Sequence, residues 1–231
     1  MAPLTRFRAK PLCPIGATTL LDASLERVAA LTEAVAVNVH HHAEQVVTHV
    51  GERAHVSIES PEALGTAGAV GHLRPWLDGR AALVVNGDTW TTIPLDPLLD
   101  GWDGARVRVL VAGPASLGPG ARIVGSLLPS SVVASLPDAP AGLWEVCWKP
   151  ALEAGELEVL GAEGPFVACD RPADYLAANL LASGGASVVG EGAVVHGELV
   201  RSVVWPGGVV RGGEVLVDAI RIDDVHTVLV R

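Results

Sequence analysis

A cluster of basic side chains opens the chain, with Arg6, Arg8 and Lys10 among the first ten residues. The whole chain has 16 Lys and Arg residues against 26 Asp and Glu residues, a formal net charge of -10. This acidic balance argues against a large nucleic-acid footprint. A local positive patch can still attract a phosphorylated small molecule. The charge pattern therefore predicts no nucleic-acid partner, and the first ten residues supply a candidate for the local positive patch that a phosphorylated substrate would need.

A second group of polar residues, Asn86, Gly87 and Asp88, follows the apolar run 81–85. Short, continuous, valine-rich runs are typical of buried parallel strands. Ligands of open α/β sheets bind at the carboxyl ends of such strands. Asn-Gly-Asp is also a common plain turn, so its position after a buried strand is what makes it a candidate ligand site.

Hydrophobic periodicity predicts the elements that would position these residues. We expect helices over residues 22–34, 43–50, from the turn at 65–68 to residue 77, and over 175–181, with strands over 35–39, 55–59, 81–85 and 106–112. Helix and strand alternate through the first 110 residues, which predicts an α/β domain with a mainly parallel sheet and flanking helices. Residues 113–125 are rich in Gly and Pro and show no clear pattern.

The C-terminal tail has a different periodicity. Val188, Val194 and Val200 recur every six residues, and Val203 and Val209 continue the period in a shifted phase. Six-residue apolar repeats with glycine-filled turns predict a left-handed β-helix of about two coils. The alternative is a pair of β-hairpins packed on the main domain. We therefore expect a main domain over residues 1–182 and a β tail over 183–231.

The sequence lacks the patterns of a membrane span, a signal segment and a cysteine-based framework. No run of about 18 apolar residues occurs, and no hydrophobic signal segment follows Met1. Cys13, Cys147 and Cys169 are far apart and lack C-x-x-C spacing, which argues against a disulfide framework and a zinc site. We expect a cytoplasmic protein with reduced thiols and no membrane partner, and a homo-oligomer stays open.

Five segments in order resemble the sugar-1-phosphate nucleotidyltransferase family, in particular its short mannose-1-phosphate guanylyltransferase-like and MurNAc-1-phosphate uridylyltransferase-like members. Residues 4–16 are similar to its "PLT…KPL.PVG" signature, 62–68 to its "LGTAG" turn and 84–88 to its "NGD" strand. Residues 37–41 resemble "VN.HH", and 172–179 resemble "PEDYL.AN".

This resemblance implies a Rossmann-like, GT-A-like fold and an enzyme that makes an NDP-sugar and pyrophosphate from an NTP and a sugar 1-phosphate. It implies that Lys10 is the catalytic phosphate-binding lysine and that Asp88 is a ligand of Mg²⁺. It places Asn86 on the substrate side. The other substrate-binding positions that it implies are Asn38, Leu64, Gly65, Thr66, Ala67 and Gly68, the glycines letting backbone approach the ligand.

The chain departs from the family pattern at two places. Relatives begin with a buried strand and a Gly-rich loop that holds the NTP phosphates, and Met1–Thr5 aligns with the end of that loop. We therefore expect a natural protein about two dozen residues longer. Relatives also carry a second metal-binding Asp where this chain has Ala168, which cannot bind Mg²⁺. Asp170, two residues later, could substitute imperfectly because it would face the same side of an extended strand.

These departures favour an alternative hypothesis, a non-catalytic relative that binds a nucleotide sugar and acts as a regulatory subunit. A trimerising or acyltransferase module is disfavoured, because two coils leave no room for an acyl-donor groove. The run 40–42 of three histidines indicates packing or solvent exposure rather than a metal site, because consecutive side chains cannot all face one ion. Lys149 comes late in the chain for a second family lysine.

Overall fold

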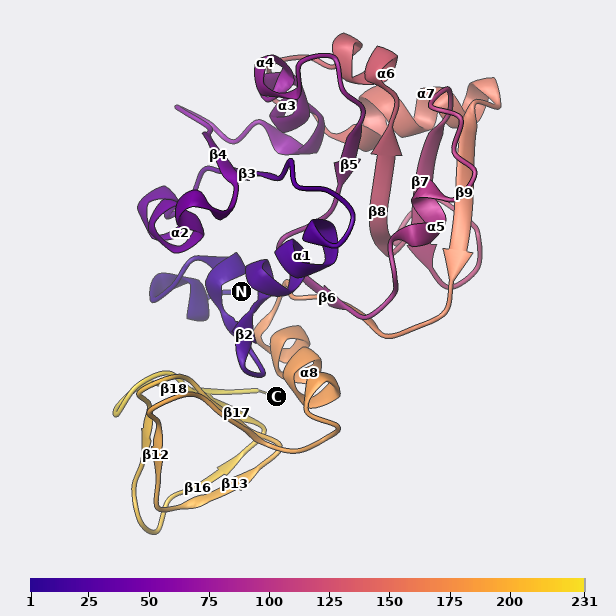
Figure 1. Ribbon diagram of the computed structural model, residues 1–231. Coiled ribbons are helices and arrows are strands. Elements are labelled where there is room, and N and C mark those ends of the chain that lie inside the picture. The colour runs from indigo at the N-terminus through magenta and orange to yellow at the C-terminus, as the bar shows by residue number, and fades with distance from the viewer. Residues whose placement is uncertain (231) are drawn as a thin grey trace. The chain divides into compact units, whose positions relative to one another are not determined.

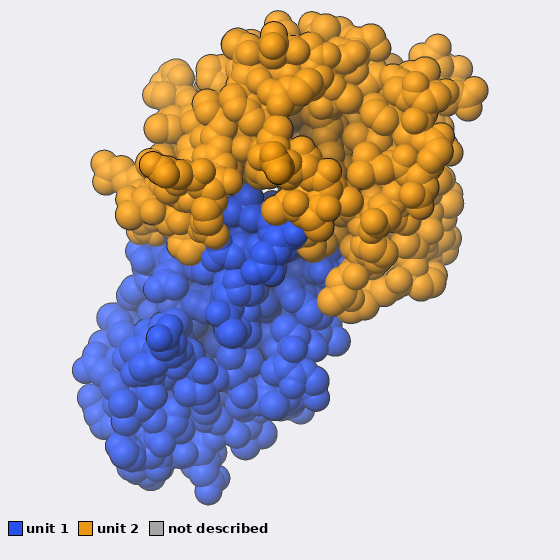
Figure 2. Space-filling view, in the orientation of Figure 1, with its two compact units in different colours: residues 1–26, 87–91, 167–231 blue, residues 27–86, 92–166 orange. Residues whose placement is uncertain are grey.

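A computed structural model describes residues 1–230 of the chain (Figure 1). These residues form two compact units, each assembled from separate segments of the chain (Figure 2). The first unit contains residues 1–26, residues 87–91 and the chain from residue 167 onward. The second contains residues 27–86 and 92–166. The expected boundary at residue 183 does not coincide with the division between these units.

The second unit is built on a four-stranded sheet with the order β5-β8-β7-β9. Its strands are β5 (Ala82–Val84), β7 (Val107–Ala112), β8 (Ile123–Leu128) and β9 (Leu157–Ala162). Strand β8 runs antiparallel to β5 and to β7, and only β7 and β9 are parallel. The prediction of a mainly parallel sheet is therefore wrong, and the sheet is mixed. The Gly- and Pro-rich segment 113–122 between β7 and β8 is short, and parallel strands need a longer crossover.

A separate two-stranded sheet in the same unit has the predicted parallel pairing. Strands β3 (Ala36–Val39) and β4 (His55–Ile58) pair in parallel, and helix α2 (Ala43–Val50) connects them. A helical crossover of this kind is the usual connection between parallel strands. The predicted helix over residues 43–50 is confirmed.

Helices cover both faces of the four-stranded sheet. They are α3 (Gly65–His72), α4 (Arg74–Leu77), α5 (Asp96–Leu99), α6 (Ser130–Ser135), a π-helical turn (Trp144–Trp148) and α7 (Lys149–Ala154), and a 3₁₀ turn (Gly51–Arg53) follows α2. Strand β7 is buried along its whole length. Two consecutive residues of this strand, Val109 and Leu110, belong to two different apolar clusters. Val109 packs with Val70 and Val133 of α3 and α6, whereas Leu110 packs with Leu98 of α5. Successive strand residues point to opposite faces, so one strand supports both layers.

The first unit begins with short elements that hold the N-terminal segment in place. They are two 3₁₀ turns (Leu4–Arg6 and Lys10–Leu12), the hairpin strands β1 (Pro14–Ile15) and β2 (Thr18–Thr19), and helix α1 (Leu20–Ala29), whose last residues belong to the second unit. Strands β6 (Thr89–Thr91) and β10 (Phe166–Ala168) form another two-stranded sheet, and helix α8 (Pro172–Ala182) follows.

The tail consists of stacked parallel strands on three faces, which outline a triangle in Figure 1. Its strands are β11 (Val188–Val189), β12 (Val194–Val195), β13 (Glu198–Val200), β14 (Val203–Val204), β15 (Val209–Val210), β16 (Val215–Val217), β17 (Ala219–Arg221) and β18 (Thr227–Leu229). Strands β11, β12 and β13 pair in parallel with β14, β15 and β16, and β14 pairs in parallel with β17. The coil pairings contradict the alternative of two β-hairpins. In the described part of the tail, which ends at residue 230, only β17 and β18 pair in antiparallel fashion.

One buried core joins the tail to the rest of the first unit. Val203 of β14 and Trp205 pack with Tyr175 of α8 and with Leu4. The next residue of β14, Val204, points into the interior of the coils instead. Alternation along the strand therefore gives the tail one apolar surface for its own core and another for α8. None of the helices in residues 1–230 is long and apolar enough to cross a bilayer.

Candidate active site

The Lys10 ammonium group lies between two carboxylates in the first unit. Its Nζ is 2.6 Å from Asp88 Oδ2 and 2.8 Å from Asp170 Oδ1. The Lys10 and Asp88 side chains are 25% and 37% exposed, whereas Asp170 is 71% exposed. Three charged groups from distant parts of the sequence therefore meet around one nitrogen atom, at a place that remains open to a ligand.

The local fold explains how these three side chains meet. Lys10 is the first residue of a 3₁₀ turn that contains Pro11, and the Cys13 N–H donates to the Lys10 carbonyl at 3.1 Å. Asp88 precedes β6, Asp170 follows β10, and these strands pair with each other. The Cys169 N–H donates to the Asp88 carbonyl at 3.2 Å. Both carboxylates therefore leave the same end of one small sheet.

The route by which Asp170 reaches this point differs from the expected one. Strand β10 ends at Ala168, and the Asp170 N–H donates to the Ala168 carbonyl at 3.0 Å, which closes a tight turn. Asp170 thus reaches Lys10 from a turn and not from an extended strand. Ala168 itself ends the strand with an exposed methyl group.

The charges of the cluster determine the protonation of Lys10. Partial burial lowers the pKa of the Lys10 ammonium, but the hydrogen bonds to Asp170 and Asp88 and their negative charges raise it more. The net result is a pKa above the ordinary value, so Lys10 carries its charge at neutral pH. One cation between two anions leaves the cluster with a net negative charge, which suits a divalent cation and opposes an unaccompanied phosphate.

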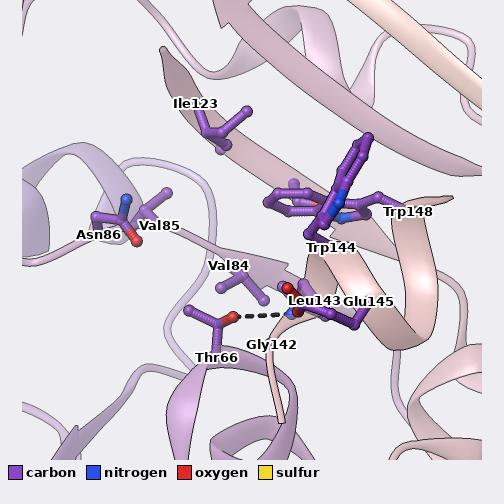
Figure 3. A pocket seen from close by; sticks show the side chains of 12 residues that line it. Thr66, Val84, Val85, Asn86, Ile123, Gly142, Leu143, Trp144, Glu145 and Trp148 are labelled. Carbon is purple, nitrogen blue, oxygen red and sulfur yellow. Dashed lines mark hydrogen bonds between the residues drawn. The ribbon is translucent and has the colours of Figure 1, made fainter. Parts of the chain in front are cut away.

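The second unit contains a pocket with a volume of about 260 Å³ (Figure 3). Its lining residues are Thr66, Val84, Val85, Asn86, Ile123, Gly125, Ser126, Gly142, Leu143, Trp144, Glu145 and Trp148. The indoles of Trp144 and Trp148 lie beside Ile123, and Thr66, Asn86 and Glu145 supply polar groups elsewhere on the wall. An apolar pocket with a few polar groups is the usual form of a small-molecule site.

Hydrogen bonds fix the aromatic wall of this pocket. The Trp148 Nε1–H donates to Ser126 Oγ at 3.1 Å, and the Ser126 hydroxyl donates to the Arg108 carbonyl at 3.1 Å. The Leu143 N–H donates to Thr66 Oγ1 at 3.0 Å. Trp144 to Trp148 form a π-helical turn, a rare element that recurs at functional sites. The wall is therefore held in position from the strands and from α3.

Only some of the substrate-binding positions implied by the family resemblance lie in the pocket. Thr66 and Asn86 line the pocket, whereas Asn38, Leu64, Gly65, Ala67 and Gly68 are absent from its lining. A Cβ at Gly65 would lie 2.7 Å from the Ala141 carbonyl oxygen, and one at Gly68 would lie 2.2 Å from the Ala139 oxygen. These glycines are therefore required by the close approach of the chain's own segment 139–141. The Ala67 N–H also donates to Ala141 O, at 2.9 Å.

Two further expectations concern basic side chains. His40 shares a hydrogen bond with the Glu59 carbonyl at 2.9 Å, and His42 precedes α2 in a left-handed conformation. Within residues 1–230, no group of three His, Cys, Asp or Glu side chains is placed to hold a metal ion. Lys149 is exposed at the start of α7, where it lies 4.0 Å from Glu153. These basic residues are outside the Lys10 cluster.

Comparison with known proteins shows which proteins this chain is similar to. Residues 1–112 match the family described as nucleotidyl transferase. The chain is also 33% identical, over 122 residues, to N-acetylmuramate alpha-1-phosphate uridylyltransferase of Caulobacter vibrioides. The resemblance to nucleotidyltransferases is therefore confirmed. The match covers 47% of this chain and 50% of the relative, so the chain spans about half the length of the curated relative.

Solved structures show a nucleotidyltransferase-type α/β fold with a mixed sheet. A Thermus thermophilus protein described as a mannose-1-phosphate geranyltransferase superposes with a TM-score of 0.69 at 19% identity, covering 100% of this chain and 90% of its own. A candidate glucose-1-phosphate thymidylyltransferase from Bacillus anthracis, solved with sucrose, gives a TM-score of 0.67 at 15% identity. That second match covers 79% of this chain and 89% of the other.

The nucleotidyltransferase motifs did not reveal two important groups of residues. Glu59 is only 5% exposed, and its carboxylate accepts hydrogen bonds from Asn38 Nδ2 and from the Leu64 N–H, each at 2.8 Å. It thus holds the start of α3 against β3. The second group is the pair Trp144 and Trp148. The available signal for this pair was two tryptophans four residues apart in a chain with six.

Proposed function

We propose that this protein is a sugar-1-phosphate nucleotidyltransferase. An oxygen of the sugar 1-phosphate attacks the α-phosphorus of an NTP, the bond to the β-phosphate breaks, and pyrophosphate leaves with that electron pair. The observation that carries the proposal is the meeting of Lys10, Asp88 and Asp170 around one nitrogen atom. Lys10 and Asp88 both lie within the matched residues 1–112.

The Lys10 ammonium is suited to hold phosphate oxygens. Its raised pKa keeps it charged, and phosphate oxygens would compete with Asp88 and Asp170 for its three N–H groups. A lysine that is paired with carboxylates before substrate arrives is also oriented in advance. Fixed positive charge near the leaving pyrophosphate stabilises the negative charge that develops there.

Asp88 and Asp170 are the residues that would hold Mg²⁺. Their carboxylate oxygens are the hard ligands that Mg²⁺ prefers, and two carboxylates together with substrate phosphates and water form a usual Mg²⁺ site. The donor set therefore fits the ion. When bound there, Mg²⁺ would screen the negative charge of the phosphates. Asp88 and Asp170 in turn would orient the phosphates toward Lys10.

The pocket of the second unit would hold an uncharged part of the substrates. Its residue Asn86 and the carboxylate residue Asp88 are separated by Gly87 alone.

Pyrophosphate release tests this function. We expect Mg²⁺-dependent release from at least one pair drawn from GTP, UTP, CTP or dTTP and a panel of sugar 1-phosphates, including N-acetylmuramic acid 1-phosphate. Lys10→Met should lower kcat by at least about a hundredfold. The proposal would be contradicted if no pair gave pyrophosphate release, or if Lys10→Met left the rate of release unchanged.

A second candidate function follows from Ala168. The family resemblance expects a metal-binding Asp at that position, and the substitute Asp170 is 71% exposed. A non-catalytic subunit that binds a nucleotide sugar would need no second metal ligand. Binding of an NDP-sugar in a thermal-shift assay without pyrophosphate release from any pair would support this alternative, and turnover that is lost in Asp88→Ala would exclude it.

We also propose that the coils of the tail are left-handed, since the six-residue valine spacing is typical of that class. Parallel stacking on three faces supports this proposal. A cytoplasmic location and a homo-oligomeric state stay predictions.

A further inference from the structure

We propose that the pocket of the second unit takes the sugar ring and selects neutral sugars against sugars that carry a carboxylate. This inference rests on the proposed function, because it names the class of sugar 1-phosphate that would be used. The observation that carries it is the charge of the pocket wall.

One charged side chain lines the pocket, and it is an acid. Among the 12 lining residues, all of them in the described part of the chain, Glu145 is the only ionisable acid, and no Lys, Arg or His is present. Within residues 1–230 the Glu145 carboxylate has no hydrogen-bond or ion-pair partner. Lys149, one turn further along the chain, is outside the lining and lies beside Glu153. The negative charge of Glu145 is therefore not compensated by the pocket.

The glycine three residues before Glu145 leaves room for its carboxylate. A Cβ at Gly142 would lie 2.3 Å from Glu145 Oε2, so a side chain at that position would displace the carboxylate. Figure 3 shows Glu145 beside Leu143 on the pocket wall. Glu145 is exposed on this part of the wall, next to Leu143, whose N–H donates to Thr66 Oγ1 at 3.0 Å.

The rest of the wall suits a pyranose ring. The indoles of Trp144 and Trp148 offer flat apolar surface to the C–H face of a sugar, and Ile123 extends it. Sugar hydroxyls are hydrogen-bond donors, and a carboxylate is a strong acceptor for them. The phosphate finds no cation in this wall. The pocket therefore fits the neutral part of a sugar 1-phosphate.

A second carboxylate in the pocket would face an uncompensated like charge. Repulsion between two unit charges a few ångströms apart, in a partly enclosed site, weakens binding by at least about tenfold. No guanidinium or ammonium in the lining can offset it. A neutral amide or hydroxyl at the same place would instead gain a hydrogen bond to Glu145.

Matched pairs of sugar 1-phosphates test this inference. Glucose and glucuronic acid 1-phosphates differ only at C6, and N-acetylglucosamine and N-acetylmuramic acid 1-phosphates differ by a lactyl ether with its carboxylate. Binding is measured by titration calorimetry and turnover as kcat/KM from pyrophosphate release. For each pair we expect the neutral sugar to be preferred at least about tenfold over the acidic one. The preference is the ratio of kcat/KM values where both sugars are turned over, and the ratio of dissociation constants otherwise.

Glu145→Gln should reduce this preference by about tenfold or more while leaving the KM for the NTP within about twofold. Glu163→Gln is the matched control, because Glu163 is another exposed glutamate of the second unit outside the pocket lining. The preference of Glu163→Gln for neutral over acidic sugars should equal that of the unchanged protein. Thermal unfolding checks that both variants are folded.

Three results would overturn the inference. An acidic sugar that is bound or used as well as its neutral counterpart excludes the charge selection. The pocket would hold another part of the substrates if Glu145→Gln left the preference for neutral sugars unchanged. The same conclusion would follow if this variant changed only the KM for the NTP. Sugar binding without pyrophosphate release refutes the proposed function alone, and absence of binding by every sugar 1-phosphate refutes the inference.

Discussion

The two units of this protein differ in how they use charge. The first unit brings Lys10, Asp88 and Asp170 together around one nitrogen atom, with Asp170 71% exposed. The second contains an aromatic pocket whose lining holds one acid and no base. This difference indicates a division of work: the first unit would manage the phosphates and the second would recognise a neutral ring. Phosphate chemistry needs concentrated charge, whereas ring recognition needs shape and apolar contact.

Polar contacts also join distant elements within each of the two units. In the first, buried Tyr175 donates to the Pro14 carbonyl and accepts from Trp205 Nε1–H at 2.9 Å, which connects α8, the N-terminal hairpin and the tail. In the second, Arg108 on β7 pairs with Glu158 on the neighbouring β9 at 2.6 Å. Each unit thus contains a polar contact between elements that are distant in sequence.

The largest effect is expected from the charged cluster. Asp88→Asn removes one negative charge and a ligand of the expected Mg²⁺, so kcat for pyrophosphate release should fall by at least about a hundredfold. Asp78→Asn is the control, because Asp78 is exposed at the end of α4 in the second unit. A kcat unchanged in Asp88→Asn would break the division of work proposed above.

A smaller effect is expected in the second unit from Glu59→Gln. The amide keeps one acceptor but presents N–H groups toward Asn38 or the Leu64 N–H, which are donors themselves. The free energy of unfolding should fall by about 2 kcal/mol, as for the loss of a buried hydrogen bond to a charged group. Urea unfolding measures it. The KM for the sugar 1-phosphate should rise while kcat changes little, and a fall in kcat alone would contradict the proposed separation.

The first unit should lose slightly less stability in Tyr175→Phe. This change leaves the buried Trp205 Nε1–H without its acceptor and removes the donor to Pro14 O, to which Asn179 still donates at 3.3 Å. We expect a loss of about 1.5 kcal/mol in urea unfolding. Trp205→Phe removes the unpaired donor, so the double variant should be less destabilised than the sum of the two single variants. Strict additivity would show that the contact contributes nothing.

The smallest effect is expected from the thiols. Burial raises the pKa of Cys13 and Cys169 to about 12 and that of Cys147 to about 11. All three thiols should therefore resist Ellman's reagent in the folded protein at pH 8 and react once urea unfolds it. Because the folded state holds these protons more tightly, their contribution to stability is present below about pH 8.5 and is lost as the pH rises toward the folded pKa values. Rapid reaction of a native thiol would contradict this burial.

Local elements were predictable from the sequence to a large degree. The short helix expected over residues 43–50 coincides with α2, and the apolar run 106–112 contains β7. The six-residue valine period predicted stacked coils, and its members Val188 and Val203 are indeed parallel partners. Such patterns depend on side-chain direction within a few residues, which a sequence contains directly.

Pairing between distant segments was less predictable. Nothing in residues 113–125 indicated that β8 would lie between β5 and β7 and run antiparallel to both. The pocket could not be derived either, because its lining brings together residues that are remote in the chain, such as Thr66, Ile123 and Trp148. Their contacts are set by long-range packing, which the types of neighbouring residues do not encode.

The sequence alone thus pointed to Lys10 and Asp88 by type and by motif, and to Asp170 only as a substitute for the Asp that relatives carry at the position of Ala168. Only the tertiary structure decided that these three meet at one point. It also decided that the LGTAG glycines pack against the chain's own carbonyl groups and that the tail shares a core with α8. The physical reason is that charge and hydrogen-bonding capacity belong to each residue, whereas proximity results from the packing of segments far apart in the chain.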